Sequence, residues 1–205
     1  MMNPQTSATH PLQIAVVGTP GGGRVGMTLC PGKRDPAAMT GPWDRDLDAD
    51  LKAIVEWGAS VLVTLMEAHE LVQLGVPDIG ERAESLGMVW LHLPIPDVSI
   101  PDAAFEAAWA TAGECLRATL TDRRGIVIHC RGGLGRTGLV AARLLIELGE
   151  MPREALDAVR AVRPGAVETR QQEEYVLGVR TSRLARPATE GLPPDPPVRG
   201  RGGSE

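Results

Sequence analysis

A cysteine and an arginine six positions apart, Cys130 and Arg136, lie in a glycine-rich segment that reads His-Cys-Arg-Gly-Gly-Leu-Gly-Arg-Thr-Gly over residues 129–138. An apolar run at residues 125–128 comes before this segment, and a helical pattern from Leu139 comes after it. We therefore expect a loop between a strand and a helix, with backbone N–H groups and the positive end of the helix dipole facing one hollow. Such a hollow binds an oxyanion, and the same donors stabilise a cysteine thiolate.

These residue types favour phosphoryl transfer from a phosphate monoester to Cys130, followed by hydrolysis of the thiophosphate. Arg136 can hold the phosphate with its planar fork, and the hydroxyl of Thr137 can help the thiolate to leave. The five intervening residues can wrap once around a tetrahedral dianion. We expect the substrate to contact Arg131, Gly132, Gly133, Leu134, Gly135 and Thr137. A nucleotide-binding P-loop would need Gly-Lys-Ser/Thr, whereas this chain has Arg136 at the position of the lysine. A purely structural alternative is a tight turn with an incidental buried cysteine.

The elements that must position this loop can be predicted from hydrophobic periodicity. Apolar runs predict strands at residues 12–17, 27–30, 61–65, 88–93 and 125–128, and helical patterns predict helices at 47–57, 67–74, 79–86, from 103, from 139, at 152–162 and at 169–184. This alternation favours a single α/β domain with a mostly parallel central sheet flanked by helices. Ligands of such sheets bind beyond the carboxyl ends of the strands, where Cys130 falls.

Length and composition fit one domain with one core, because the chain has 205 residues, is 43% hydrophobic and carries a net charge of −5. We predict a flexible N-terminus at residues 1–11, a phosphatase-like domain at 12–186 and a disordered proline- and glycine-rich tail at 187–205. The chain has no polybasic run, which argues against nucleic acid, and no apolar stretch of about 20 residues to span a membrane. The absence of an apolar leader and the three cysteines favour a cytoplasmic protein. The histidines show no ligand spacing, so we expect no metal.

Four segments carry a resemblance to a known family: TLCPGKRD at 28–35, LPIPD at 93–97, residues 129–145, and RPGAVETRQQEEYV at 163–176. The glycine-rich segment matches the HCxxGxxR(S/T) signature of the protein-tyrosine and dual-specificity phosphatases. The four together resemble the kinase-associated dual-specificity phosphatases and their bacterial relatives, over about residues 26–182. The resemblance implies an α/β domain with the active-site loop between a strand and a helix, and cysteine-dependent hydrolysis without a cofactor.

The resemblance also implies a general acid on a mobile loop about thirty residues before the cysteine. Asp97 fits, because it ends the LPIPD segment directly after a predicted strand. Asp102 is the competitor, although its place before an amphipathic run favours a helix N-cap. Gln172 aligns with the family glutamine that positions the hydrolytic water, and Gln171 is a register alternative. A solvated glutamine at a helix start is the structural alternative for both.

The expected substrate is a phosphorylated protein or a small phosphate ester. With one tyrosine and one phenylalanine in the chain, a shallow pocket that admits phosphoserine, phosphothreonine or phosphotyrosine is favoured over a deep aromatic slot. Phosphoinositide phosphatases of similar sequence carry lysines inside the loop, where this chain has Arg131 and Leu134. A phosphoinositide substrate is therefore not favoured.

Three alternatives remain open at this point. A non-catalytic phosphopeptide binder would use the same loop, but intact Cys130, Arg136 and Asp97 argue against it. A sulfur-transfer or arsenate-reducing enzyme would not require Asp97 or the segment at 163–176. Cys30 is either a redox partner of Cys130 or a packing residue.

Overall fold

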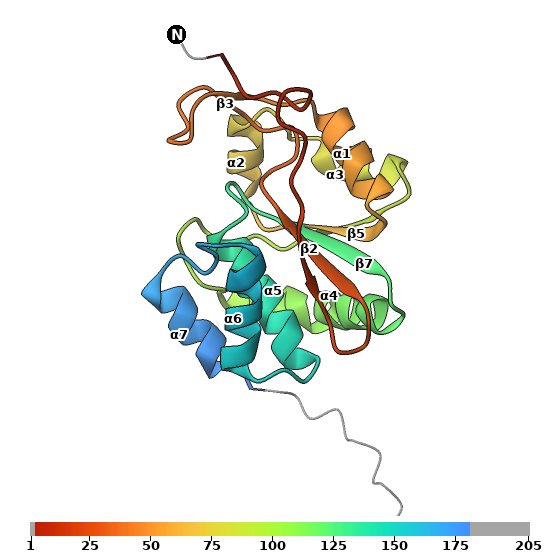
Figure 1. The fold of residues 1–205 in the computed structure, drawn as a ribbon, viewed down its shortest axis with the longest axis vertical. Coiled ribbons are helices and arrows are strands. Elements are labelled where there is room, and N and C mark those ends of the chain that lie inside the picture. The colour runs from red at the N-terminus through yellow and green to blue at the C-terminus, as the bar shows by residue number, and fades with distance from the viewer. Residues whose placement is uncertain (1–2, 181–205) are drawn as a thin grey trace, which may run out of the picture.

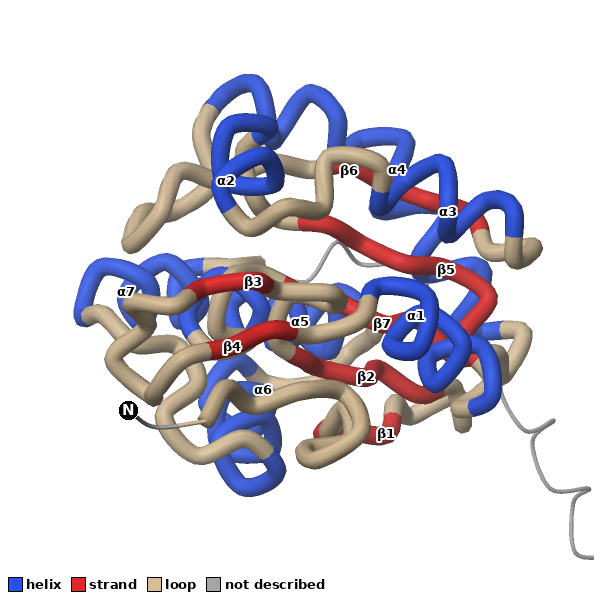
Figure 2. Tube along the Cα trace, turned by 90° about the horizontal axis from the view of Figure 1, so that it is seen from above, coloured by secondary structure: helices blue, strands red, loops and turns tan. Residues whose placement is uncertain are grey.

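A five-stranded sheet forms the centre of the chain in the computed structural model, which describes residues 3–180. Figure 2 shows the strands in the order β1-β2-β7-β5-β6. Their bounds are β1 (Ala15–Gly18), β2 (Arg24–Thr28), β5 (Ala59–Thr64), β6 (Val89–His92) and β7 (Gly125–His129). The edge strand β1 is antiparallel to β2, and the other neighbouring strands are parallel. The prediction of a mostly parallel central sheet is confirmed.

Helices cover both faces of this sheet (Figure 1). Helices α1 and α3 pack against β5 and β6 on one face, while α4, α5 and α6 pack against β7, β2 and β1 on the other, with α7 against α5 and α6. Their bounds are α1 (Leu47–Glu56), α2 (Ala68–Gln73), α3 (Ile79–Ser85), α4 (Ala103–Thr121), α5 (Gly135–Glu147), α6 (Pro152–Val162) and α7 (Arg170–Gly178). This arrangement confirms the single α/β domain.

The central strand β7 explains why the chemistry falls where it does. All five of its residues are buried, as the sequence Gly-Ile-Val-Ile-His predicts for a strand covered on both faces. Its last residue, His129, pairs with Thr28 of β2 on one side and Thr64 of β5 on the other. The residue after β7 therefore emerges at the centre of the carboxyl edge of the sheet.

Side-chain caps fix the starts of three helices. The carboxylate of Asp102 accepts a hydrogen bond from Phe105 N at 2.8 Å and begins α4, which confirms the expected N-cap. Asp46 begins α1 in the same way, and Thr169 begins α7 with a capping box completed by Gln172.

The structure moves some predicted boundaries. β2 begins at Arg24 rather than at residue 27, because a tight turn with Gly22 at φ 87° joins it to β1 as a hairpin. A second hairpin, β3 (Arg34–Asp35) and β4 (Trp43–Asp44), was not predicted, because two-residue strands show no measurable period.

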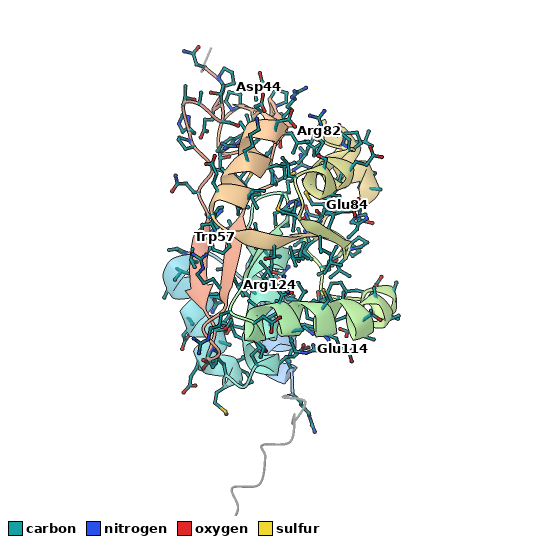
Figure 3. The ribbon with its side chains drawn as sticks, turned by 90° about the vertical axis from the view of Figure 1, so that its right-hand side faces the viewer. Asp44, Trp57, Arg82, Glu84, Glu114 and Arg124 are labelled. Carbon is teal, nitrogen blue, oxygen red and sulfur yellow. The ribbon has the colours of Figure 1, made fainter. Side chains whose placement is uncertain are left out.

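Part of the N-terminal segment predicted to be flexible packs against this second hairpin. Gln5 N donates to Pro42 O at 2.8 Å, Asp44 N donates to Gln5 O at 3.1 Å, and Asp46 N donates to Ser7 Oγ at 2.9 Å. The open edge of β4 offers backbone groups that this segment satisfies. In Figure 3 the label Asp44 lies at this end of the molecule, and the label Arg82, a residue of α3, is near it.

Helix α7 ends at Gly178, earlier than the predicted helix at 169–184, because the backbone of Val179 is already extended. Residues 181–184 and the predicted tail at 187–205 lie outside the described residues. Between residues 3 and 180, no helix combines the length and the apolar character needed to cross a membrane.

Candidate active site

Cys130 directly follows β7, and α5 begins five residues later at Gly135. Gly135, Arg136 and Thr137 form the first turn of α5, whose N–H groups have no partner within the helix and point back at the loop. Only 4% of Cys130 is exposed. The predicted strand, glycine-rich loop and helix are therefore present in the predicted order.

Arg136 is 2% exposed, and Glu70 of α2 holds its guanidinium. Nη1 donates to Glu70 Oε2 at 2.6 Å and to the carbonyl of Ile95 at 3.0 Å, and Nη2 donates to Glu70 Oε1 at 2.9 Å. Burial opposes the charge of Arg136, but its hydrogen bonds to Glu70 prevail and raise its pKa. Burial likewise opposes the charge of Glu70, but its hydrogen bonds from Arg136 hold its pKa below the ordinary value. The pair is ionised and fixes the plane of the guanidinium.

Asp97 reaches the same guanidinium from the loop after β6. Its Oδ1 lies 2.8 Å from Arg136 Nη2, and its side chain is 57% exposed. Val98, at φ 57°, donates its N–H to Asp97 Oδ1 at 3.1 Å, so a strained turn orients this carboxylate. Asp102, the competing candidate, is engaged at the start of α4.

A cavity of about 670 Å³ opens above the loop. Of the predicted site residues, it is lined by Asp97, Cys130, Arg131, Gly132, Leu134, Arg136 and Gln172. The predicted contacts Gly133, Gly135 and Thr137 do not line it. Gly133 instead lies against β2, where a Cβ would come within 2.3 Å of Thr28 O. Its φ of 72° also favours glycine.

Arg163 lines the cavity and holds the carbonyl side of the loop, a role that the sequence did not reveal. Its Nε donates to Gly133 O and its Nη2 to Gly132 O, both at 3.1 Å. Burial lowers its pKa, although the neighbouring Cys130 opposes the shift. Because these carbonyl oxygens are turned outward to Arg163, the loop keeps its N–H groups available on the other side.

Gln172 lies at the site, but its carboxamide is already engaged. Its Oε1 accepts from Glu168 N at 3.1 Å and Thr169 N at 3.4 Å, and its Nε2 donates to Ser99 O at 3.0 Å. Gln172 therefore connects α7 to the loop that carries Asp97. Its expected role in positioning water stays a prediction.

Glu168 was not predicted at the site. Its Oε2 accepts from Gly135 N at 2.8 Å, at the start of α5, and its side chain lines the cavity. A Cβ on residue 135 would come within 2.4 Å of this oxygen, so the carboxylate would have to move to accommodate one. One N–H at the helix N-terminus is thus held by a carboxylate of the chain itself.

His129 is completely buried behind the loop, and its Nε2 lies 2.8 Å from Thr64 Oγ1, which also accepts from Trp90 Nε1 at 2.9 Å. Burial lowers the pKa of His129 to about 3, so the imidazole is neutral and unsuited to act as a proton donor. Thr137 Oγ1 is buried and has no hydrogen-bond partner among the described residues.

The three cysteines are free thiols, and Cys30 lies beside the loop. Cys30 N donates to Arg131 O at 3.4 Å, and burial, followed by the charge of Cys130, raises the pKa of the Cys30 thiol. Within residues 3–180, no three His, Cys, Asp or Glu side chains come together in a way that could hold a metal ion.

Known proteins match the chain in sequence. A family model described as "Polymorphic toxin system, DSP-PTPase phosphatase" matches residues 37–150. Cyclin-dependent kinase inhibitor 3 of Rattus norvegicus is 35% identical over 135 residues, which cover 64% of this chain and 62% of that protein. The chain thus spans less than two thirds of the length of this relative.

Solved structures match the fold. Kinase-associated phosphatase with its catalytic-site cysteine replaced by serine has a TM-score of 0.71 and 28% identity, and the match covers 81% of this chain and 92% of that one. Tk-PTP in its active form has a TM-score of 0.59 and 29% identity, with 79% and 93% coverage. Together with the family model, these matches confirm the resemblance read from the sequence. The chain belongs to the DSP-PTPase phosphatase family, within the dual-specificity and protein-tyrosine phosphatase superfamily.

Proposed function

We propose that this chain removes phosphate from phosphorylated tyrosine, or from serine and threonine, in proteins by way of a cysteinyl-phosphate intermediate. One observation carries the proposal: a buried cysteine at the head of a helix shares its cavity with an arginine whose plane is fixed by Glu70 and whose outer edge faces Asp97. Nucleophile, anion receptor and proton donor are then within one site.

Arg136 has the donors that a phosphate needs. Its Nη1 is used by Glu70 and Ile95, but its Nε makes no hydrogen bond among the described residues, and its Nη2 contacts Asp97, whose side chain is 57% exposed. A phosphate that takes Nε and Nη2 would receive the bidentate fork and would displace Asp97 from Nη2.

In the first step, the Cys130 thiolate attacks phosphorus, the bond from phosphorus to the leaving oxygen breaks, and Asp97 gives that oxygen its proton. The N–H groups of the loop and Arg136 stabilise the charge on the phosphoryl oxygens. His129 stays neutral and supports the loop from behind.

In the second step, water attacks the phosphocysteine, the bond between sulfur and phosphorus breaks, and Asp97 takes the proton that water loses. The hydroxyl of Thr137, which has no hydrogen-bond partner within residues 3–180, can donate to the departing thiolate. Gln172 remains the proposed residue for positioning this water, although its carboxamide must first release one of its present partners.

The family supports a protein substrate, and the open cavity supports a side chain larger than phosphate itself. Exposed apolar residues at the cavity, Met39 and Val98, offer contacts to a peptide. A small phosphate ester is the second candidate. A cytoplasmic location suits this chemistry, because a reducing compartment keeps a thiolate nucleophile from being oxidised.

Rapid-quench labelling tests the proposal. Wild-type protein mixed with radiolabelled aryl phosphate should hold phosphate on Cys130, and Cys130→Ser should lose turnover while it still binds vanadate or phosphate. Turnover should persist in EDTA. Label on serine or histidine would refute the mechanism, and anion binding with no turnover by the wild type would favour a phosphopeptide-binding protein.

A further inference from the structure

The cavity above Cys130 extends to the β3–β4 hairpin, where two cations share one carboxylate. Lys33 Nζ lies 3.6 Å from Asp35 Oδ2, and Arg131 Nη2 donates to the same oxygen at 3.0 Å. All three residues line the cavity together with Cys130. Burial opposes the charge of Asp35, but Arg131 and Lys33 lower its pKa, so it is ionised. This wall therefore carries one positive charge in surplus.

Lys33 is the more informative of the two cations. Its side chain is only 8% exposed, yet its ammonium, which has three N–H donors, makes no hydrogen bond to any residue among those at positions 3–180. The ring of Trp43, 5.8 Å away, and the carboxylate of Asp35 explain where the ammonium lies, but neither contact is a hydrogen bond. Lys33 lines the cavity, so the three N–H groups of its ammonium are available to an anion that binds there.

The other two arginines that line the cavity, Arg136 and Arg163, already donate hydrogen bonds to groups of the chain. Arg163 donates to the carbonyl oxygens of Gly132 and Gly133, and Arg136 to Glu70 and the phosphate position. Arg131, by contrast, makes one side-chain hydrogen bond within the described part of the chain, and its side chain is 36% exposed. Lys33 and Arg131 thus supply donors that the scissile phosphate does not use.

We infer that Lys33 and Arg131 form a second anion subsite beside the catalytic loop, and that the preferred substrate is a phosphate monoester bearing a second anionic group. This inference rests on the function proposed above. The second group is a carboxylate or phosphate that accepts hydrogen bonds from Lys33 and joins Asp35 on Arg131. It can come from a neighbouring residue of a phosphopeptide or from a second phosphate on a small molecule.

Matched substrates test the subsite. One arm compares a phosphotyrosine peptide flanked by alanines with the same peptide flanked by glutamate or phosphoserine, and the other compares a sugar monophosphate with its bisphosphate. The wild type should prefer the doubly anionic member by roughly 10-fold in kcat/KM at low salt, the effect of one charge-assisted hydrogen bond. The preference should shrink as ionic strength rises. The arm with the larger preference identifies the source of the second anion.

Variants assign the preference to Lys33. Lys33→Met should remove most of the preference, while Lys33→Arg should retain it because the cation remains. Lys52→Met is the matched control, since Lys52 is the other lysine of the chain and lies exposed on α1, and it should leave the preference intact. Thermal unfolding of each variant separates a loss of selectivity from a loss of fold.

The outcomes distinguish the subsite from the function. Equal use of singly and doubly anionic substrates by an active wild type would overturn the subsite alone, as would a Lys33→Met variant that slows both classes equally. No turnover of any phosphate would instead overturn the proposed function. The Cys130→Ser protein would then still report the subsite through its relative affinity for the same peptides.

Discussion

Asp97 Oδ1 lies 2.8 Å from Arg136 Nη2, so the expected general acid contacts the edge of the guanidinium that faces the phosphate position. Glu70 and Ile95 hold the opposite edge of Arg136. A phosphate bound at this edge of Nη2 would occupy the position of Asp97 Oδ1. We propose that substrate binding displaces the Asp97 side chain from Arg136 toward the leaving oxygen, so that the arginine couples binding of the anion to placement of the acid.

Replacement of this acid should depend on the leaving group. Asp97→Asn should slow hydrolysis of phenyl or alkyl phosphates by ~100-fold or more, because their leaving oxygens need a proton in the transition state. Activated aryl phosphates with weakly basic leaving groups should be affected much less. The slope of log kcat/KM against the leaving-group pKa measures this difference.

The matched control for this prediction is Asp102→Asn, five residues further along the chain. Asp102 caps α4, and asparagine is also a good N-cap, so we expect a small loss of stability and no change in the slope. A steeper slope in the Asp102 variant, with the Asp97 variant unchanged, would exchange the two assignments.

Glu70→Ala should cost both stability and anion binding. It leaves the guanidinium of Arg136 buried without its main partner, and such a loss typically costs about 3–5 kcal/mol. Urea unfolding and vanadate titration measure the two effects. Glu174→Gln is the control, since its ion pair with Arg170 is exposed on both sides and should be worth less than about 1 kcal/mol. Equal losses in the two variants would contradict the assigned role of Glu70.

The same pair predicts a dependence of stability on pH. The pKa of Glu70 is lowered from about 4.5 in the folded state, so the unfolded chain binds more protons there. The stabilisation is fully present above pH 4.5 and is lost as the pH falls through the folded pKa. Compared with wild type, Glu70→Gln should therefore lose less of its remaining stability between pH 5 and acid unfolding, as measured by urea midpoints. A parallel decline in both proteins would count against an ionised pair.

Gln172→Ala should act on the loop that carries Asp97. It removes the hydrogen bond to Ser99 O and the caps on the N–H groups of Glu168 and Thr169. We expect kcat to fall, with a leaving-group slope shifted part of the way toward that of Asp97→Asn. If Gln172 acts only on water, the slope stays unchanged, and phosphocysteine accumulates in the rapid-quench experiment instead.

Much of the fold could be predicted because its strands are apolar runs between clear turns. The bounds of β5, β6 and β7 differ by at most two residues at either end from the strands predicted at 61–65, 88–93 and 125–128. The β3–β4 hairpin and its pairing with Gln5 could not be predicted, since they depend on backbone contacts between segments of polar residues that share no period.

The site was predictable where one local motif carries it. Cys130 and Arg136 are six positions apart, and Asp97 follows a recognisable segment. Glu70 and Arg163 act through contacts with residues 66 and 30 positions away, respectively. The residues next to Glu70 and Arg163 in the sequence do not indicate these partners. An acidic residue on a helix, or an arginine that follows a helix, is most often solvated.

Glu168 gives the last prediction, because its carboxylate occupies an N–H of the helix start on which the phosphate loop depends. Gly135 N donates to Glu168 Oε2 at 2.8 Å. A phosphate dianion entering the cavity meets this negative charge and competes with it for the same donor. Glu168→Gln keeps an acceptor of the same shape but removes the charge, so vanadate and phosphate should bind roughly 3- to 10-fold more tightly, with a larger gain at low ionic strength. Glu174→Gln removes one acidic charge from the exposed pair with Arg170 instead, and it should leave the inhibition constants unchanged. Weaker anion binding by Glu168→Gln would mean that the carboxylate supports the loop in its binding conformation rather than competing with the substrate.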